Sequence, residues 1–358
     1  AELAIPDNGW YTDSYGNTFF YKQGKKLRNC IVELEDADGS VYGYYFDPQG
    51  VMARYFSYVV TNCLNINGYA SNGTVKADKD GHLLEGWQYD SDTDTYTYYG
   101  KYYIQYRSSI LEENGLLYYF NADGLLERGS EVVIDGILYD ADENGVLLNR
   151  AMQGQYAPGS TFKVVTTLEF MREHSDYASY SYECTGAIEQ GDVRIQCYNG
   201  TVHGTVDLEQ SLAYSCNTSF SNIGLSLDVS KFRDTAKELL FNSKLPYVLP
   251  YSKSSFKLTS DSVDGDKMMT AMGQGDTEVS PYHMALITSA IANGGVLMKP
   301  YLIDTVANNG GAQVKKTKTK EYGTLMTPEE ASQLKQYMTS VAQYGTASVL
   351  SGQSYTAA

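Results

Sequence analysis

The chain has 358 residues, of which 42% are hydrophobic and 20% are charged, so its composition is that of a globular protein long enough for two or three domains. Its formal net charge of −16 argues against nucleic-acid binding, because no basic stripe is available to meet phosphates. No apolar run approaches the ~20 residues that span a bilayer, and no signal peptide is recognisable at residues 1–6. Either the chain is not exported, or its export segment lies outside these residues.

Residues 1–145 form one compositional block that is rich in aromatic side chains. The block holds 19 of the 33 tyrosines, both tryptophans and only two prolines. One phrase recurs along it: strand residues, often aromatic, then a polar turn that ends in glycine, then aliphatic residues. The turn glycines are Gly24, Gly50, Gly81, Gly124 and Gly145. The phrase predicts strand–turn–strand units, and its repetition predicts an all-β hairpin-repeat solenoid.

This block resembles the cell-wall-binding repeats of Gram-positive surface proteins, of the choline-binding and glucan-binding type. The Gly-Trp pair that opens such repeats is present at Gly9–Trp10 and Gly86–Trp87. The resemblance implies that aromatic side chains bind choline by cation–π attraction or stack on sugars. The candidate ligand-binding aromatics are Trp10, Tyr44, Tyr45, Trp87, Tyr118 and Tyr119. The alternative is that these rings only form the core of the solenoid.

The sequence pattern changes at residues 146–150, after which helical periodicity dominates. Apolar spacing predicts a turn and helix over 153–173, and further helices over 206–215, from 215 onward, and over 230–240, 282–293 and 328–344. Residues 180–203 are predicted as loop or hairpin, and 296–306 as extended, followed by a Lys- and Thr-rich hairpin. The chain is therefore expected to be α+β and multidomain, with a helix-rich second domain over 146–358.

The helix predicted over 153–173 begins with a candidate nucleophile. Ser160 follows a Pro-Gly turn at the helix start, and Lys163 lies one turn later on the same face. A hydroxyl beside an amine in this geometry can be a nucleophile and its base. The same Ser-x-x-Lys spacing occurs at Ser254/Lys257 and at Ser332/Lys335. Taken alone, each of the three pairs is more often structural than catalytic.

The five cysteines show no Cys-x-x-Cys spacing, and the four histidines are scattered. Neither a metal site nor a cofactor is therefore predicted. Cys184 and Cys197 bracket a hairpin-like segment, and both a disulfide and two free thiols are compatible with the sequence there. His203 is interpreted as a structural residue.

Two further phrases place the Ser160 helix in a pattern. Ser215-Cys-Asn217 follows it, and Met272-Gly-Gln-Gly275 comes about sixty residues later. The three phrases in this order, with the segments between them, resemble the transpeptidase domain of class B penicillin-binding proteins, which cross-link peptidoglycan. The resemblance extends from about residue 147 to 358 and thins toward the end. A pair of cysteines is often found in Gram-positive relatives where Cys184 and Cys197 lie.

The resemblance implies a role for each motif residue. Ser160 would attack the carbonyl of D-alanyl-D-alanine or of a β-lactam, and Lys163 would be the base. Ser215 would relay a proton to the leaving nitrogen, and Asn217 would hold a substrate amide and the lysine. A weaker substrate-binding role is implied for Gly273, Gln274 and Gly275.

The sequence departs from the family in its third motif. No Lys-Thr-Gly occurs in the 358 residues, and the phrase that leads into that motif is found at residues 345–358. The second domain is therefore expected to be truncated before Lys-Thr-Gly, with an incomplete central sheet, and to be acylated poorly or not at all.

The leading interpretation is a serine D,D-transpeptidase that binds penicillin covalently and is tethered to wall polymer by its repeats. Its partners would be peptidoglycan stem peptides and β-lactams, with choline-bearing teichoic acid or glucan at the repeats. It would act at the extracellular face of the membrane or in the wall. One alternative is a non-catalytic wall-binding protein with an inactive transpeptidase remnant, and another is a β-lactam sensor or serine β-lactamase.

Overall fold

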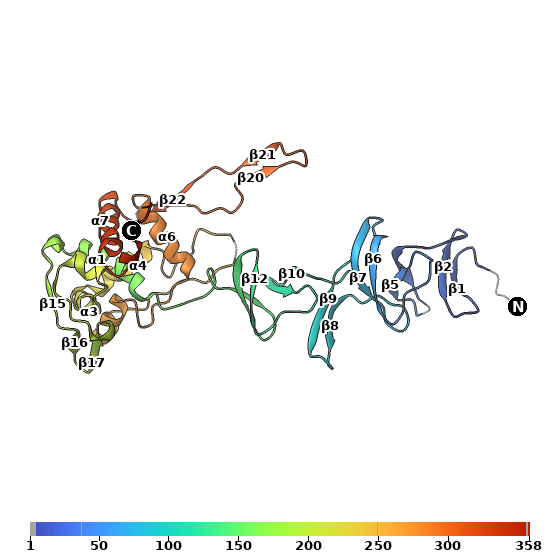
Figure 1. The fold of residues 1–358 in the computed structure, drawn as a ribbon, viewed down its shortest axis with the longest axis horizontal. Helices are drawn as coiled ribbons and strands as arrows, with labels where there is room; N and C mark the ends of the chain where they lie inside the picture. Colours follow the sequence, from blue (N-terminus) through green and yellow to red (C-terminus); the bar gives the residue numbers. More distant parts are fainter. Residues whose placement is uncertain (1–4, 37, 249, 356) are drawn as a thin grey trace. The chain divides into compact units, whose positions relative to one another are not determined.

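The computed structural model describes residues 5–36, 38–248, 250–355 and 357–358. The chain divides into two compact units, Ala1–Leu148 and Asn149–Ala358, which are described separately below (Figure 1). Strands and short turns make up the first unit, whereas helices dominate the second (Figure 1).

The described part of the first unit contains only strands and turns, which form five small antiparallel sheets with one parallel pairing. The three-stranded sheets are β1 (Gly9–Thr12), β2 (Thr18–Lys22) and β3 (Lys25–Lys26), and β12 (Ser130–Ile134), β13 (Ile137–Ala141) and β14 (Leu147–Asn149). The four-stranded sheet has the order β5 (Val41–Phe46), β4 (Cys30–Glu35), β6 (Ser57–Leu64) and β7 (Ala70–Lys76). The two hairpins are β8 (Gly86–Asp90) with β9 (Thr95–Tyr99), and β10 (Ser109–Glu113) with β11 (Leu116–Phe120).

Several turns of this unit are closed by the same side-chain hydrogen bonds. At Asp47, the side-chain Oδ1 accepts hydrogen bonds from the backbone N–H groups of Gln49 and Val51, both at 2.8 Å. Equivalent pairs of bonds are accepted by Asp78, Asn121 and Asp142. Three residues after each of these lies a glycine with positive φ, between 79° and 94°, a backbone conformation that favours glycine. The predicted glycine turns are therefore confirmed at Gly50, Gly81, Gly124 and Gly145.

The prediction of a continuous solenoid is not confirmed, because the described strands form separate sheets. The β6–β7 hairpin extends one sheet to four strands. The pairing of β4 with β6 is parallel, and β6 carries an irregularity between Val60 and Cys63. Such interruptions change the twist and register locally, so successive hairpins do not join into one regular array.

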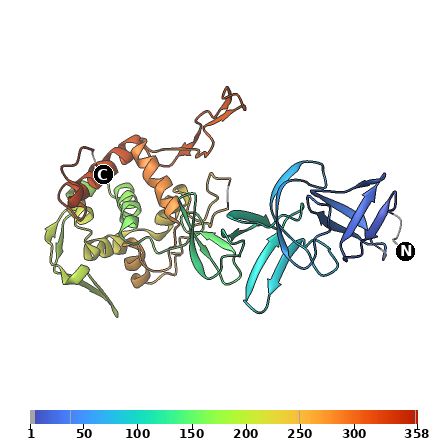
Figure 2. The same ribbon diagram turned by 45° about the vertical axis from the view of Figure 1, so that its right-hand side comes forward.

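In the second unit the helices pack around α1 (Lys163–Glu173), which contacts α2, α3, α4 and α7 (Figure 2). The core includes Phe162, Leu168, Phe220 and Ile287, each at most 1% exposed. The remaining helices are α2 (Leu208–Ala213), α3 (Asn217–Ser226), α4 (Val229–Glu238), α5 (Asp264–Ala271), α6 (Pro281–Ala292) and α7 (Pro328–Gln343). The helices predicted from apolar spacing are confirmed to within a few residues at each end.

Side-chain caps explain where several of these helices begin. Asp207 and Gln210 form a capping box at α2, and Thr327 and Glu330 form another at α7. Ser280 caps α6 by accepting a hydrogen bond from a backbone N–H of its first turn.

The sheets of the second unit are small. Its described residues form four two-stranded antiparallel sheets. The pairs are β15 (Tyr182–Cys184) with β18 (Gly204–Val206), β16 (Ala187–Gln190) with β17 (Val193–Gln196), β19 (Val296–Met298) with β22 (Glu321–Thr324), and β20 (Thr305–Ala307) with β21 (Gln313–Lys316). The predicted hairpins between Cys184 and Cys197 and in the Lys- and Thr-rich segment are confirmed.

Candidate active site

Ser160 lies in a short 3-10 turn, Gly159–Phe162, that leads directly into α1. The turn is anchored by Phe162, which is fully buried and packs against Phe241 and Phe256. Ser160 itself is exposed, whereas Lys163 is fully buried. The buried Phe162 side chain therefore fixes the turn so that Ser160 is exposed to solvent while the Lys163 side chain lies in the interior.

Lys163 is the centre of a polar cluster that joins the first two sequence motifs. Its Nζ lies 2.9 Å from Ser160 Oγ, 2.9 Å from Ser215 Oγ and 2.8 Å from Asn217 Oδ1. The backbone oxygen of Ser215 lies at 3.1 Å. Four oxygens thus surround a group that carries three N–H bonds when charged and two when neutral.

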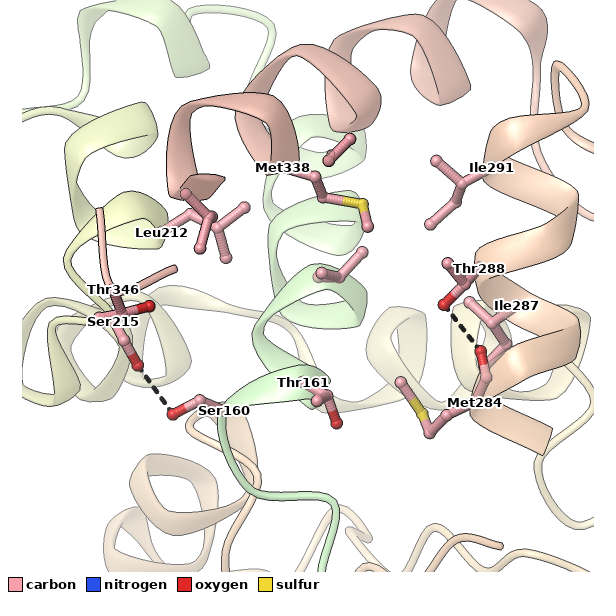
Figure 3. Close-up of a pocket in the computed structure, with 13 residues that line it drawn as sticks. Ser160, Thr161, Leu212, Ser215, Met284, Ile287, Thr288, Ile291, Met338 and Thr346 are labelled. Atoms are coloured by element: carbon pink, nitrogen blue, oxygen red, sulfur yellow. Dashed lines mark hydrogen bonds between the residues drawn. The ribbon is translucent and has the colours of Figure 1, made fainter. Parts of the chain in front are cut away.

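The two serines contact each other directly. Ser215 Oγ lies 2.8 Å from Ser160 Oγ, as the dashed line in Figure 3 shows. Ser215 has a positive φ of 51°, which is uncommon for a residue other than glycine. Asn217 begins α3, and its Nδ2 donates to the carbonyl oxygen of Gln196 at 3.0 Å, which fixes the amide so that Oδ1 faces Lys163. The structure therefore brings together all four residues that the sequence predicted as catalytic.

Burial in the cluster makes the Lys163 amine easier to deprotonate than a lysine in water. Burial lowers the pKa of Lys163 from 10.5 to about 8, and nearby Cys216 and Cys197 oppose this shift when ionised. A lysine with a pKa near neutrality can accept a proton from a hydroxyl. The arrangement can therefore transfer the Ser160 proton to Lys163 and connect both groups to Ser215.

Comparison with known proteins shows the family of this chain. Residues 129–358 match the family described as the penicillin binding protein transpeptidase domain. The chain belongs to this family. Its second unit carries the α+β transpeptidase domain of a class B penicillin-binding protein.

Several relatives and solved structures resemble this transpeptidase domain. The peptidoglycan D,D-transpeptidase PbpA of Mycolicibacterium smegmatis is 29% identical over 211 residues, which cover 56% of this chain and 42% of that protein. Penicillin-binding protein 3 of Bacillus subtilis is 30% identical over 172 residues, which cover 46% of this chain and 25% of that protein. The match thus covers less than half of the length of either relative.

Among solved structures, the D,D-transpeptidase domain of an Eggerthella lenta peptidoglycan glycosyltransferase aligns with a TM-score of 0.54 at 25% identity, covering 58% of this chain and 54% of that one. Penicillin-binding protein A of M. tuberculosis, in an imipenem acyl-enzyme complex, aligns with a TM-score of 0.50 at 26% identity. This alignment covers 55% of this chain and 46% of that one.

The loop of the third predicted motif, residues 272–275, packs against the turn that carries Ser160. Gly159 N–H donates to the carbonyl oxygen of Gly273 at 2.8 Å. Gly273 has φ +85°, and a Cβ added there would overlap the Gly159 carbonyl oxygen. Gln274 and Gly275 continue the same loop, and none of the three lines the groove described below. The structure gives this loop a packing role in the transpeptidase domain, and its contact with substrate stays a prediction.

The backbone contact at Gly273 leads to a stability prediction. We expect Gly273→Ala to lower the free energy of unfolding by about 3 kcal/mol, from the strain of a positive φ and from steric overlap together. Gly275→Ala is the matched control, because it has φ +81° but only ordinary contacts at 3.5 Å or more. We expect the control to lose only about 1 kcal/mol from backbone strain. Urea unfolding of both variants measures the difference, and equal losses would contradict the overlap at Gly273.

A groove of about 280 Å³ opens beside Ser160 and Ser215. Figure 3 shows Leu212, Met338, Ile291 and Ile287 directed toward the space between their helices, with Ser160 and Ser215 at one end. The helices are α1, α2, α6 and α7. The sequence predicted an incomplete central sheet but not this groove.

The other two Ser-x-x-Lys pairs have structural surroundings. Ser254 is 1% exposed, and its hydroxyl accepts a hydrogen bond from the backbone N–H of Ser280 at 3.3 Å. Ser332 and Lys335 are both exposed on α7. Of the three pairs, only Ser160 and Lys163 share a hydrogen bond among the described contacts.

The first unit holds two similar aromatic pockets. In one, the Trp10 and Tyr44 rings meet edge to face at 4.9 Å, beside Met52 and Arg54. In the other, Trp87 and Tyr118 meet at 5.1 Å, beside Leu126 and Arg128. The aliphatic residue and the arginine follow each tyrosine by eight and ten positions, a spacing that could have revealed them in the sequence.

The two remaining predicted ligand aromatics face elsewhere, which corrects the prediction. Tyr45 is 4% exposed and packs in a core with Ile31 and Val60. Tyr119 packs against the cluster that contains Val132. Successive side chains on a strand point to opposite faces, so only one of each adjacent tyrosine pair can line the pocket.

Proposed function

We propose that the transpeptidase domain forms an acyl-enzyme at Ser160 with D-alanyl-D-alanine stem peptides and with β-lactams. The observation that supports this most strongly is the contact of a buried lysine with Ser160, Ser215 and Asn217 within 2.9 Å. Ser160 Oγ attacks the carbonyl carbon while its proton passes to the neutral Lys163 amine. The C–N bond then breaks, Ser215 delivers its proton to the leaving nitrogen, and Lys163 returns the proton taken from Ser160 to Ser215, which lies 2.9 Å away.

The second half of the reaction regenerates the serine. The amine of another stem peptide attacks the ester carbonyl, a new amide bond forms, and the Ser160 hydroxyl is released with its proton. The backbone N–H of Ser160 at the start of the 3-10 turn supports the proposal as one donor to the oxyanion.

Incubation of the full chain with fluorescent penicillin tests this proposal. We expect covalent labelling that maps by peptide mass spectrometry to the segment containing Ser160. Labelling elsewhere would overturn the assignment. Sustained turnover of nitrocefin would instead favour a β-lactamase, for which no water-activating glutamate could be placed from the sequence.

Among the described residues, no helix is long and apolar enough to cross a bilayer. We propose that the chain acts at the outer face of the membrane or in the wall, where peptidoglycan is cross-linked.

We also propose that the first unit tethers the domain to wall polymer. The support is the repeated pocket of a tryptophan, a tyrosine, an aliphatic side chain and an arginine. Carboxylates line each pocket beside its arginine: Asp36 and Asp80 in the first, and Glu143 in the second. A neutral, hydroxyl-rich ligand can stack on the rings and bond to both kinds of charged group. We therefore propose glucan as the ligand.

Sedimentation of the full chain with insoluble glucan, and with choline-derivatised resin, tests the tether. We expect Trp87→Ala to weaken glucan binding about tenfold through lost stacking worth about 1–1.5 kcal/mol. Tyr15→Ala is the matched control, because Tyr15 is 89% exposed and lines neither pocket. Binding to choline resin but not to glucan would reverse the ligand assignment. Binding without any penicillin labelling would favour a non-catalytic wall-binding protein.

A further inference from the structure

Four side chains that can bind a metal meet next to the Ser-Cys-Asn segment. They come from four separate places: Cys184 ends β15, Cys197 follows β17, His203 precedes β18, and Cys216 is the N-cap residue of α3. Their ligand atoms all lie within 4.8 Å of one another, and the three cysteines are buried. The sequence did not predict this site, because its cysteines are spaced by 13 and 19 residues and no Cys-x-x-Cys pair is present.

The separations between these atoms match the edges of a metal-centred tetrahedron. Zinc–sulfur bonds of about 2.3 Å at tetrahedral angles place two sulfurs about 3.8 Å apart, and a zinc–nitrogen bond of about 2.0–2.1 Å places nitrogen and sulfur about 3.6 Å apart. Cys184 Sγ and Cys197 Sγ are 3.8 Å apart, and Cys197 Sγ and Cys216 Sγ are 3.7 Å apart. Cys184 Sγ and His203 Nδ1 are 3.4 Å apart.

We propose that Cys184, Cys197, His203 and Cys216 bind one zinc ion in a structural, four-coordinate site. Three thiolates and one imidazole form a donor set that zinc prefers, and four protein ligands leave no open position for a substrate. Because the four ligand atoms lie within 4.8 Å of one another, there is room between them for one ion but not for an iron–sulfur cluster. A disulfide accounts for the geometry less well, because it would join only two of the three sulfurs, and Cys197 is nearly equidistant from the other two.

A second layer of contacts surrounds the four ligands. Thr218 Oγ1 lies 3.2 Å from Cys184 Sγ and 3.3 Å from Cys216 Sγ, so its hydroxyl can donate to one ligand sulfur. The His203 ring lies parallel to the Tyr214 ring, with 5.8 Å between their centroids. Such partners orient ligands around structural metals.

The position of Cys216 gives the site a consequence for the neighbouring cluster. Cys216 lies between Ser215 and Asn217, and both of these contact Lys163. A zinc ion bound to Cys216 would connect this segment to the β15–β18 sheet and to the β16–β17 hairpin. Zinc therefore acts through the positions of Ser215 and Asn217 and does not touch the reacting atoms. The site is independent of the proposed acylation, since its occupancy is measured without penicillin.

The zinc content of the full chain, purified under reducing conditions and supplied with zinc, tests the proposal. We expect one zinc per chain, released by an organomercurial thiol reagent and measured with a chromogenic indicator. Cobalt in its place is expected to give the thiolate charge-transfer and intense visible bands of tetrahedral coordination. Retention of no zinc, together with a disulfide between two of these cysteines, would overturn the site.

Variants separate the site from general unfolding. We expect His203→Ala to lose zinc and His203→Cys to retain it, because the latter restores four ligands. Cys30→Ser is the matched control, since Cys30 is a buried free cysteine of the first unit, and we expect it to keep full zinc. A chelator is expected to lower the Tm of the wild type reversibly and to leave that of His203→Ala unchanged. Equal zinc in His203→Ala and the wild type would contradict the assignment of the ligands.

Discussion

Replacing Ser160 with alanine is expected to abolish covalent labelling by fluorescent penicillin. The Ser160 hydroxyl is the exposed member of the cluster, it lies 2.9 Å from the Lys163 amine, and it borders the groove. Removing an attacking hydroxyl in such a cluster typically lowers the rate by about 10⁴-fold or more. Labelling should be followed to saturation over long incubations at high penicillin concentration.

Ser332→Ala provides the matched control for this experiment. Ser332 also belongs to a Ser-x-x-Lys pair, but both of its members are exposed on α7. We expect the control to be labelled at the wild-type rate. If Ser160→Ala were labelled as fast as the control, the nucleophile would be a different residue, and the proposed acyl-enzyme would be wrong.

Lys163 governs the second large effect, which is the dependence of acylation on pH. The lysine can accept a proton only when neutral, and burial lowers its pKa to about 8. Below pH 8 most of the amine is protonated, so the labelling rate should rise by about tenfold per pH unit toward 8 and then level off. Lys163→Ala should lose about 10²–10⁴-fold in rate and its pH dependence in this range.

Two further lysine variants sharpen the test. Lys163→Arg keeps the positive charge but cannot be deprotonated, so we expect it to be as slow as Lys163→Ala. Lys335→Ala is the control, because Lys335 belongs to the exposed pair on α7. Initial labelling rates between pH 6 and pH 9 measure these effects, with penicillin stability followed in parallel. A flat or falling wild-type profile would show that Lys163 is not the base.

Local sequence patterns were sufficient to predict most of the helices of the second unit. The Ser160 and Lys163 contact follows from a three-residue spacing on one helix, and the capped helices began close to where they were predicted. The contact with Ser215 and Asn217 was reached by resemblance to a family. No spacing rule could have given it, because 55 residues separate Ser160 from Ser215.

The predictions that the structure does not confirm, and the site that was not predicted, depend on features other than local sequence patterns. The hairpin turns were predicted correctly from their glycines, yet the solenoid was not found, since the association of hairpins depends on register and twist between distant strands. Tyr45 was assigned to a ligand site although the alternation of strand faces places it opposite Tyr44. The cluster around Cys184 was missed because its four members converge only through long-range packing.

The turns of the first unit bear on how such a chain can change length during evolution. In several of these turns one Asp or Asn side chain binds two backbone N–H groups of its own turn, as Asp47 does for Gln49 and Val51. A hairpin built this way brings its closing bonds with it, so duplicating or deleting one leaves few backbone donors unpaired in its neighbours. The number of aromatic pockets, and with it the avidity for the wall polymer that we propose they bind, can therefore vary without any change in the unit that carries Ser160.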